Sequence, residues 1–177
     1  LLVNLSQGRL GEDNSALLGA MIITKIQLSA MRRARSPDVK WRDFFLYVDE
    51  FQNFATTSFI KILSEARKYR LGLILANQYV EQIEESIMAA IIGNAGTLVT
   101  FLLGSPDAQK LEKEFAEVFT YNDLTHLGRG EAVLKLAIDG LTSRPFFIKT
   151  LPPAASSNQN KDKVIRVSRE HWASKEK

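Results

Sequence analysis

The sequence contains no cysteine among its 177 residues. This absence excludes a disulfide framework and a cysteine-based zinc site, and it fits a protein that works in a reducing compartment. No apolar run approaches the roughly 18 residues of a membrane-spanning helix, and no signal peptide is visible. The chain opens on Leu1-Leu2-Val3 without an initiator methionine, so we expect it to be a piece of a longer protein.

A phosphate-binding P-loop is also missing from the sequence. There is no Gly-Lys-Ser or Gly-Lys-Thr, and Gly8 and Gly11 lack the lysine and the spacing that such a loop requires. Without that cradle for phosphates, the chain alone is not expected to bind ATP tightly. Histidine is scarce as well. His126 and His171 belong to no triad or metal-site pattern, and we interpret both as surface residues.

The composition is that of a soluble globular domain. Hydrophobic residues make up 45% of the chain and charged residues 24%, which allows one domain with a sizeable core. The net charge of +3 arises in residues 161–177, which hold six Lys or Arg and three Asp or Glu. A basic tail can attract nucleic acid or anionic lipid, although most such tails are simply solvated. We divide the chain into a domain over residues 1–153 and a polar, basic tail over residues 154–177.

Apolar runs that alternate with helical patterns predict an α/β fold. Because strands and helices alternate, we expect βαβ units and a mostly parallel sheet flanked by helices, with a hairpin turned at Asp139-Gly140 that adds antiparallel strands at one edge. The strands predicted at 44–48 and 71–76 are expected to be buried. The predicted strands are 1–5, 44–48, 71–76, 96–103, 131–138 and 141–149. The predicted helices are 13–35, 56–70, 83–92, 105–119, a short turn at 120–127, and 168–175.

Some of these elements carry more detailed expectations. Asp13, Asn14 or Ser15 is expected to cap the first helix, whose apolar half, Ala16–Ile23, is expected to pack deep against the sheet. Residues 154–163 are expected to be mobile because they are polar. In the last helix, Trp172 is expected to act as an anchor.

The stretch around which the chain is organised is Phe44–Gln52. Its five leading apolar residues predict a strand buried on both faces. Asp49 and Glu50 follow where the strand should leave the sheet, and ligands of open α/β sheets bind outside the carboxyl ends of strands. This is the Walker B pattern, in which Asp49 holds a hydrated Mg²⁺ and Glu50 orients the attacking water. A core strand followed by two solvated acids explains the same pattern equally well.

Two further groups could complete a site of this kind. Gln78 ends the next predicted strand, and if the two strands are neighbours their tips lie roughly 5 Å apart. Its amide could sense a γ-phosphate, or it could merely cap a helix. The helix between the two strands ends in Arg67-Lys68-Tyr69-Arg70. These cations form either a solvated helix end or an arginine finger that stabilises transition-state charge at a neighbouring subunit.

Taken in order, these motifs resemble the second half of the type IV secretion coupling-protein ATPases. That family comprises conjugative DNA pumps of the HerA/FtsK-type hexameric motors with a RecA-like core. The similarity extends over residues 1–153. The segments that carry it are Asn4-Leu5-Ser6, Gly8-Arg9, Gly11–Asn14, Leu46–Phe54, Glu65–Arg70 and Ala76-Asn77-Gln78.

The resemblance implies a role for each site residue. Asp49 would be the Walker B acid on the Mg²⁺ side, acting through water, and Glu50 would be the catalytic glutamate. Gln78 would be the γ-phosphate sensor. Arg67 would be the trans-acting finger, with Arg70 in reserve. ATP and Mg²⁺ would be bound by the full-length protein, and neither is expected to bind this chain tightly.

The resemblance also implies a partial RecA-like P-loop NTPase fold. The family's Walker A strand, all-helical DNA-facing domain and membrane helices would lie upstream of Leu1. The full-length protein would be a hexamer at the cytoplasmic face of the bacterial inner membrane, with DNA, relaxosome proteins and secretion-channel proteins as partners. The Walker A strand of such sheets sits between the strands predicted at 71–76 and 96–103. Without it, we expect these two strands either to close on each other or to associate with another chain.

Three functions follow from the sequence. The first is a motor fragment that supplies Walker B, sensor and finger to an ATPase that is active only in the full-length hexamer. The second is a non-catalytic RecA-like module that binds DNA or a partner protein, which requires that no Walker A lies upstream. The third is nucleic-acid binding driven by the basic tail, which would weaken steeply with salt.

Overall fold

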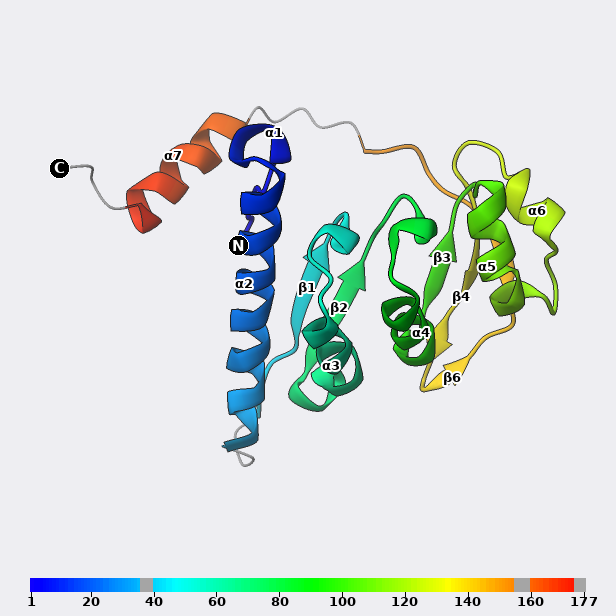
Figure 1. Cartoon of the computed structure of the whole chain (residues 1–177), viewed down its shortest axis with the longest axis horizontal. Coiled ribbons are helices and arrows are strands. Elements are labelled where there is room, and N and C mark those ends of the chain that lie inside the picture. The colour runs from blue at the N-terminus through cyan, green and yellow to red at the C-terminus, as the bar shows by residue number, and fades with distance from the viewer. Residues whose placement is uncertain (36–39, 155–159, 174–177) are drawn as a thin grey trace.

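The computed structural model describes residues 1–35, 40–154 and 160–173 of an α/β protein. Figure 1 shows a long N-terminal helix beside a parallel strand pair, with a second sheet and its helices on the other side of that pair. The α-helices are α1 (Gln7–Leu10), α2 (Glu12–Met31), α3 (Thr57–Glu65), α4 (Glu85–Asn94), α5 (Ser105–Phe115), α6 (Tyr121–Thr125) and α7 (Lys161–Trp172). The strands are β1 (Phe44–Val48), β2 (Leu71–Leu75), β3 (Leu98–Thr100), β4 (Glu131–Lys135), β5 (Ala137–Ile138), β6 (Leu141–Thr142) and β7 (Phe146–Lys149).

The strands of the described residues form three separate sheets. β1 and β2 pair in parallel, with Phe44 opposite Leu71 and Val48 opposite Leu75. β3, β4 and β7 form an antiparallel sheet in that order, and β5 pairs with β6. The prediction of a mostly parallel sheet is therefore wrong, since β1–β2 is the one parallel pair among the described strands. The reason is that the C-terminal hairpin inserts β4 next to β3 instead of extending a parallel sheet at its edge.

The predicted hairpin itself is confirmed. Asp139 and Gly140 both adopt positive φ angles, 50° and 84°, as a tight two-residue hairpin turn requires. The hairpin is interrupted on both arms, because the β5–β6 pair at its tip is separated from the β4–β7 pair at its base.

β2 and β3 do not pair with each other. Figure 1 shows them running in the same direction and apart from each other, with α4 and the segment leading into it drawn between them in this view. The expectation that these strands close directly is wrong, because β3 is paired with β4 and packs with α5 and α6 in a core of its own. Association of the two open edges with another chain stays a prediction.

The first core lies between the β1–β2 pair and helices α2, α3 and α4. It is built from apolar side chains on one face of each element, including Val48, Ile62, Leu71 and Ile87. On the opposite face of β1, Phe45 and Tyr47 are 60% and 73% exposed. The prediction that β1 is buried on both faces is therefore wrong, since the described helices cover only one of them.

Helix α2 joins this core along a narrow stripe. Its buried residues are Ser15, Gly19, Ile23 and Ala30, spaced so that they share one face of the helix. At Gly19 the helix comes so close to Phe54 that a Cβ would lie 2.2 Å from its ring. The expectation that residues 16–23 pack deep is wrong for much of the segment, because it is apolar all round and only one face can meet the core. Leu17, Leu18 and Met21 are exposed.

The start of the chain also differs from the prediction. Leu1–Leu5 forms no strand, and the loop predicted after it contains the single-turn helix α1. The cap of α2 is Gly11, and none of the three predicted polar residues takes that place. Ser15 instead donates its hydroxyl hydrogen to the carbonyl oxygen of Leu5 at 2.6 Å, which ties the extended N-terminal segment to the helix.

The second core holds α5 and α6 against the β3–β4–β7 sheet. Phe115, Leu124 and Val133 are fully buried in it. The short turn predicted at 120–127 contains helix α6, and Thr120 and Asp123 form a reciprocal capping box at its start. The backbone N–H and hydroxyl of Thr120 both donate to the Asp123 carboxylate, which lowers the pKa of that group below its usual value.

The tail forms a helix earlier than predicted. Helix α7 begins at Lys161 and ends at Trp172, and its residues are all exposed. Trp172 is 83% exposed, so it is not the predicted anchor within the described chain. Residues 155–159 of the segment predicted to be mobile lie outside the described residues. His126 and His171 are at the surface, as predicted. Among the described helices, none has the length and apolar character needed to span a bilayer.

Candidate functional site

The parallel pairing of β1 and β2 brings the predicted acidic pair and the predicted amide to one edge of the sheet. The two strands are neighbours, which meets the condition set by the sequence, and both end at this edge. Backbone hydrogen bonds continue past the strands: Ala76 N–H donates to Val48 O at 2.9 Å, and Phe51 N–H donates to Ala76 O at 3.1 Å. Glu50 and Gln78 therefore emerge from adjacent chain segments at the carboxyl edge of the β1–β2 pair.

Glu50 is held in an unusual backbone conformation. Its φ and ψ are 49° and 46°, in the left-handed region that residues other than glycine rarely occupy. The turn after it, Phe51–Asn53, fixes this geometry, because Asn53 N–H donates to Glu50 O and the buried ring of Phe51 stacks on Phe59 at 6.1 Å. Backbone strain of this kind persists where the surroundings enforce it, and it is concentrated at functional sites.

The side chains at this edge form a small polar network. The carboxylate of Glu50 accepts a hydrogen bond from Gln52 Nε2 at 2.6 Å, and the same nitrogen lies 3.4 Å from Gln82 Oε1. Asp49 is exposed, and its Oδ1 accepts the backbone N–H of Glu50 at 3.1 Å. Gln78 is exposed as well.

Two buried polar atoms at the same edge lack partners. Among the described residues, Gln52 Oε1 and Asn77 Nδ2 are the buried side-chain atoms without a hydrogen bond. Native proteins rarely leave such atoms unmatched, and those that remain call for an explanation. Both atoms lie beside Glu50 and Gln78, so this edge is where the described structure leaves buried polar atoms without hydrogen-bond partners.

The donor set at this edge suits a hard cation only in part. Asp49 offers carboxylate oxygens, which Mg²⁺ prefers, and Mg²⁺ commonly keeps several waters while binding one or two carboxylates and a substrate phosphate. No group of three or more His, Cys, Asp or Glu side chains in the described chain could hold a metal by itself. The residues thus fit a magnesium ion that is shared with a phosphate, and they do not form a complete protein cage.

A residue that the sequence did not single out supports this edge from the other core. The carboxylate of Asp107, at the start of α5, accepts the backbone N–H groups of Val80 and Glu81, both at 2.9 Å. Asp107 is only 5% exposed, and Val80 is buried in the second core. Asp107 thereby fixes the turn that follows Gln78. Its partners lie 26 and 27 residues away, so no local sequence pattern could reveal the role.

The predicted arginines lie at the opposite edge of the β1–β2 pair. Arg67 and Arg70 come from the last turn before β2 begins, and both are exposed. Arg70 pairs with Asp43, just before β1, at 3.1 Å. The structure therefore separates the arginines from Glu50 and Gln78 by the length of the strands.

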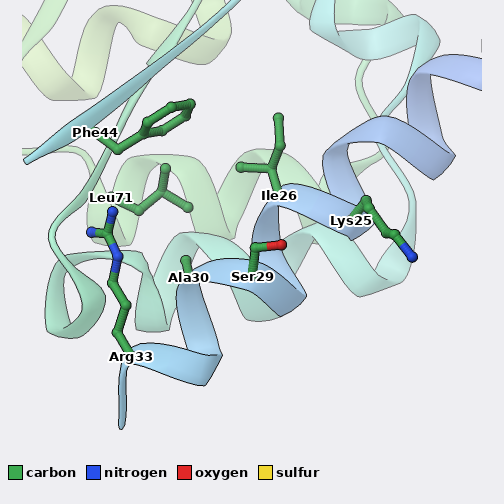
Figure 2. A pocket seen from close by; sticks show the side chains of 7 residues that line it. All are labelled: Lys25, Ile26, Ser29, Ala30, Arg33, Phe44 and Leu71. Atoms are coloured by element: carbon green, nitrogen blue, oxygen red, sulfur yellow. The ribbon is translucent and has the colours of Figure 1, made fainter. Parts of the chain in front are cut away.

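Arg33 organises this opposite edge. Its guanidinium donates to the carbonyl oxygens of Tyr69 and Arg70 at 2.6 and 3.4 Å, and it stacks over Trp41 at 5.4 Å. A pocket of about 290 Å³ lies beside it (Figure 2), so the pocket is at the arginine edge and not at Glu50. Its lining residues are Lys25, Ile26, Ser29, Ala30, Arg33, Phe44 and Leu71.

Comparison with known proteins finds one matching family model. Residues 43–127 match the family model described as the TraM recognition site of TraD and TraG. This segment of the chain is thus similar to that family. The match covers a little under half of the chain and includes β1, β2, α3 to α6, and all of the predicted site residues. The resemblance to the coupling-protein ATPases is thereby confirmed. A search of curated proteins finds no matching sequence.

Solved structures share the fold at low sequence identity. The bacterial conjugative coupling protein TrwB, unbound, matches with a TM-score of 0.58 and 13% identity over 74% of this chain and 37% of that one. TrwB in complex with the non-hydrolysable GTP analogue GDPNP gives 0.57 and 14%, over 73% and 36%. The DNA-packaging ATPase B204 of Sulfolobus Turreted Icosahedral Virus gives 0.54 and 17%, over 75% and 62%. The chain thus spans less than two thirds of each of these proteins.

Replacing Asp107 tests the support of the turn after Gln78. We expect Asp107→Ala to lower the free energy of unfolding by about 3 kcal/mol, because it leaves the buried N–H of Val80 and the part-buried N–H of Glu81 without a charged acceptor. Asp107→Asn should cost less, since one acceptor oxygen remains. Urea unfolding measures the loss, and amide exchange should speed up at Val80 and Glu81. Asp162→Ala, in the exposed helix α7, is the control. Unchanged exchange at both amides would contradict the assignment.

Proposed function

We propose that this chain supplies half of the ATP site of a hexameric conjugative motor that translocates DNA or protein. The observation that carries the proposal is the parallel pairing of β1 and β2, which brings Asp49, Glu50 and Gln78 to one edge. The family match and the fold shared with TrwB, which has been solved with a GTP analogue, support a nucleotide at this position. The chain contributes Walker B and sensor, and the phosphate cradle comes from elsewhere in the longer protein.

Each residue at the edge has a distinct part in hydrolysis. Glu50 orients a water molecule for attack on the γ-phosphorus and accepts its proton as the bond to the ADP oxygen breaks. Gln78 hydrogen-bonds the γ-phosphate and reports whether it is present. Asp49 holds Mg²⁺ through water, and the ion, when bound, neutralises charge on the phosphates.

The open edge of β2 is where the missing half of the site belongs. Because successive backbone groups of a strand point to opposite sides and Ala76 N–H points to β1, the N–H and C=O groups of Leu71, Leu73 and Leu75 point away from β1. They face the interval between β2 and β3. We propose that a Walker A strand of the longer protein pairs there and places its loop over Glu50 and Gln78.

Arg67 acts on a neighbouring subunit. It lies at the edge opposite Glu50, so it cannot reach the nucleotide bound by its own chain. In a head-to-tail ring the arginine edge of one subunit faces the carboxyl edge of the next, and each site receives a finger from its neighbour. Arg70 is less suited to the role, because its guanidinium is paired with Asp43 and its backbone is in the left-handed conformation.

A second candidate function is recognition of a partner protein. It is favoured by the description of the matching family as a TraM recognition site. In this proposal the domain docks a relaxosome protein at the cytoplasmic face of the bacterial inner membrane, near the secretion channel and the DNA. Both functions can reside in one protein, but a non-catalytic module requires that the longer protein contain no Walker A sequence.

Glu50→Gln in the longer protein tests the catalytic role. We expect ATP hydrolysis to be abolished while ATP binding is retained, because the amide keeps the shape of the side chain but cannot accept the proton of the water. Turnover and nucleotide binding are measured on the same preparation. Persistent turnover would show that Glu50 is not the catalytic base.

Mixing subunits tests whether Arg67 acts in trans. Arg67→Ala should lower turnover about a thousandfold or more, the usual worth of an arginine finger. Mixed rings of Arg67→Ala and Glu50→Gln subunits should regain activity, because some interfaces then combine an intact Glu50 with an intact Arg67. Lys68→Ala, next to it and also exposed, is the matched control and should keep its activity. If mixing restores nothing, the finger does not act across subunits.

A further inference from the structure

The hydrogen bond from Gln52 to Glu50 is the shortest polar contact at the carboxyl edge. Gln52 Nε2 lies 2.6 Å from Glu50 Oε2, and both residues are half-buried. Gln52 sits in the turn directly after Glu50, where its neighbour Phe51 is buried and stacked on Phe59. The amide is therefore presented to the carboxylate from a rigid backbone.

We propose that Gln52 is a positioning residue that fixes the carboxylate of Glu50 for ATP hydrolysis. The inference rests on the proposed function of Glu50 and adds a residue to it. With Oε2 engaged by the amide, the carboxylate is restrained about its side-chain bonds, and Oε1 is left to accept the hydrogen of the attacking water. Holding a catalytic base in one orientation is a recognised source of rate enhancement.

The hydrogen-bond balance of Gln52 argues against a purely structural role. A buried amide that only supports the fold satisfies both its donor and its acceptor. Gln52 instead directs its donor to Glu50, while its buried Oε1 has no partner. The fold tolerates this unmatched oxygen at the place where it holds Glu50.

The turn that bears Gln52 also meets the segment that follows the sensor. Gln52 Nε2 lies 3.4 Å from Oε1 of Gln82, four residues beyond Gln78. That segment is clamped by Asp107 through the N–H groups of Val80 and Glu81. Gln52 therefore stands between the proposed base and a turn whose position is fixed from the second core.

The test compares Gln52 variants in the longer protein that hydrolyses ATP. Gln52→Met keeps the length of the side chain and removes the hydrogen bond. We expect kcat to fall about 10–100-fold with the KM for ATP unchanged, as for other residues that orient a catalytic group. The matched control is Gln109→Met on the exposed face of α5, which should leave both constants as in the wild type.

Gln52→Glu supplies a second readout, because it keeps the size of the side chain. It replaces the amide donor with a carboxylate that repels the carboxylate of Glu50, so kcat should fall at least as far as in Gln52→Met while the KM for ATP stays unchanged. A normal kcat in either variant, or a loss that appears only in KM, would overturn the inference.

The proposed function and the positioning role of Gln52 fail in different ways. If Glu50→Gln still hydrolyses ATP, the proposed function fails. If Glu50→Gln is inactive while both Gln52 variants behave like the wild type, only the positioning role fails. Because the Gln52→Glu side chain differs from glutamine by one group of the same size, its kcat and KM remain measurable even if the methionine variant unfolds.

Discussion

The parallel pairing of β1 with β2 is the interaction on which the rest of the structure depends. Its register sets Val48 opposite Leu75, and the chain beyond each strand stays hydrogen-bonded to the other through Ala76. Parallel strands end at the same edge, so an acidic pair and an amide that are far apart in sequence emerge together. The same pairing sends Arg67, which precedes β2, to the opposite edge. One backbone arrangement thus produces two surfaces of different chemistry, as the proposed ring of identical subunits requires.

The second constraint is the interval between β2 and β3. The chain has two cores, one on each side of this interval, and the strands that border it offer unpaired backbone groups to it. Unpaired edges of this kind invite another strand. Among the described residues, Asp107 links the two parts of the chain, because its carboxylate accepts hydrogen bonds from the backbone N–H groups of Val80 and Glu81. The side chain of Val80 also packs in the second core. The position of the turn after Gln78 therefore depends on contacts from both cores.

Local patterns predicted the elements well and their partners less well. The apolar run at Phe44–Val48 and the Asp139-Gly140 turn lie where the sequence places them, because strand and hairpin signals are encoded by neighbouring residues. The exposure of Phe45 and Tyr47, the antiparallel pairing of β3, and the surface position of Trp172 depend on which segments cover them, and local sequence does not specify this. At the site, the edge shared by Glu50 and Gln78 followed from the α/β rule. Asp107 and the bond from Gln52 to Glu50 could not be foreseen, since one joins distant segments and the other requires a left-handed residue at Glu50.

The most direct test of the central claim is a structure of the longer protein with a non-hydrolysable ATP analogue. We predict an added parallel strand between β2 and β3, with the γ-phosphate within reach of Gln78 and of a water held by Glu50. Arg67 should approach the phosphates of the adjacent subunit. A nucleotide bound away from the carboxyl edge of β1 and β2, or an interval between β2 and β3 that stays open, would contradict it.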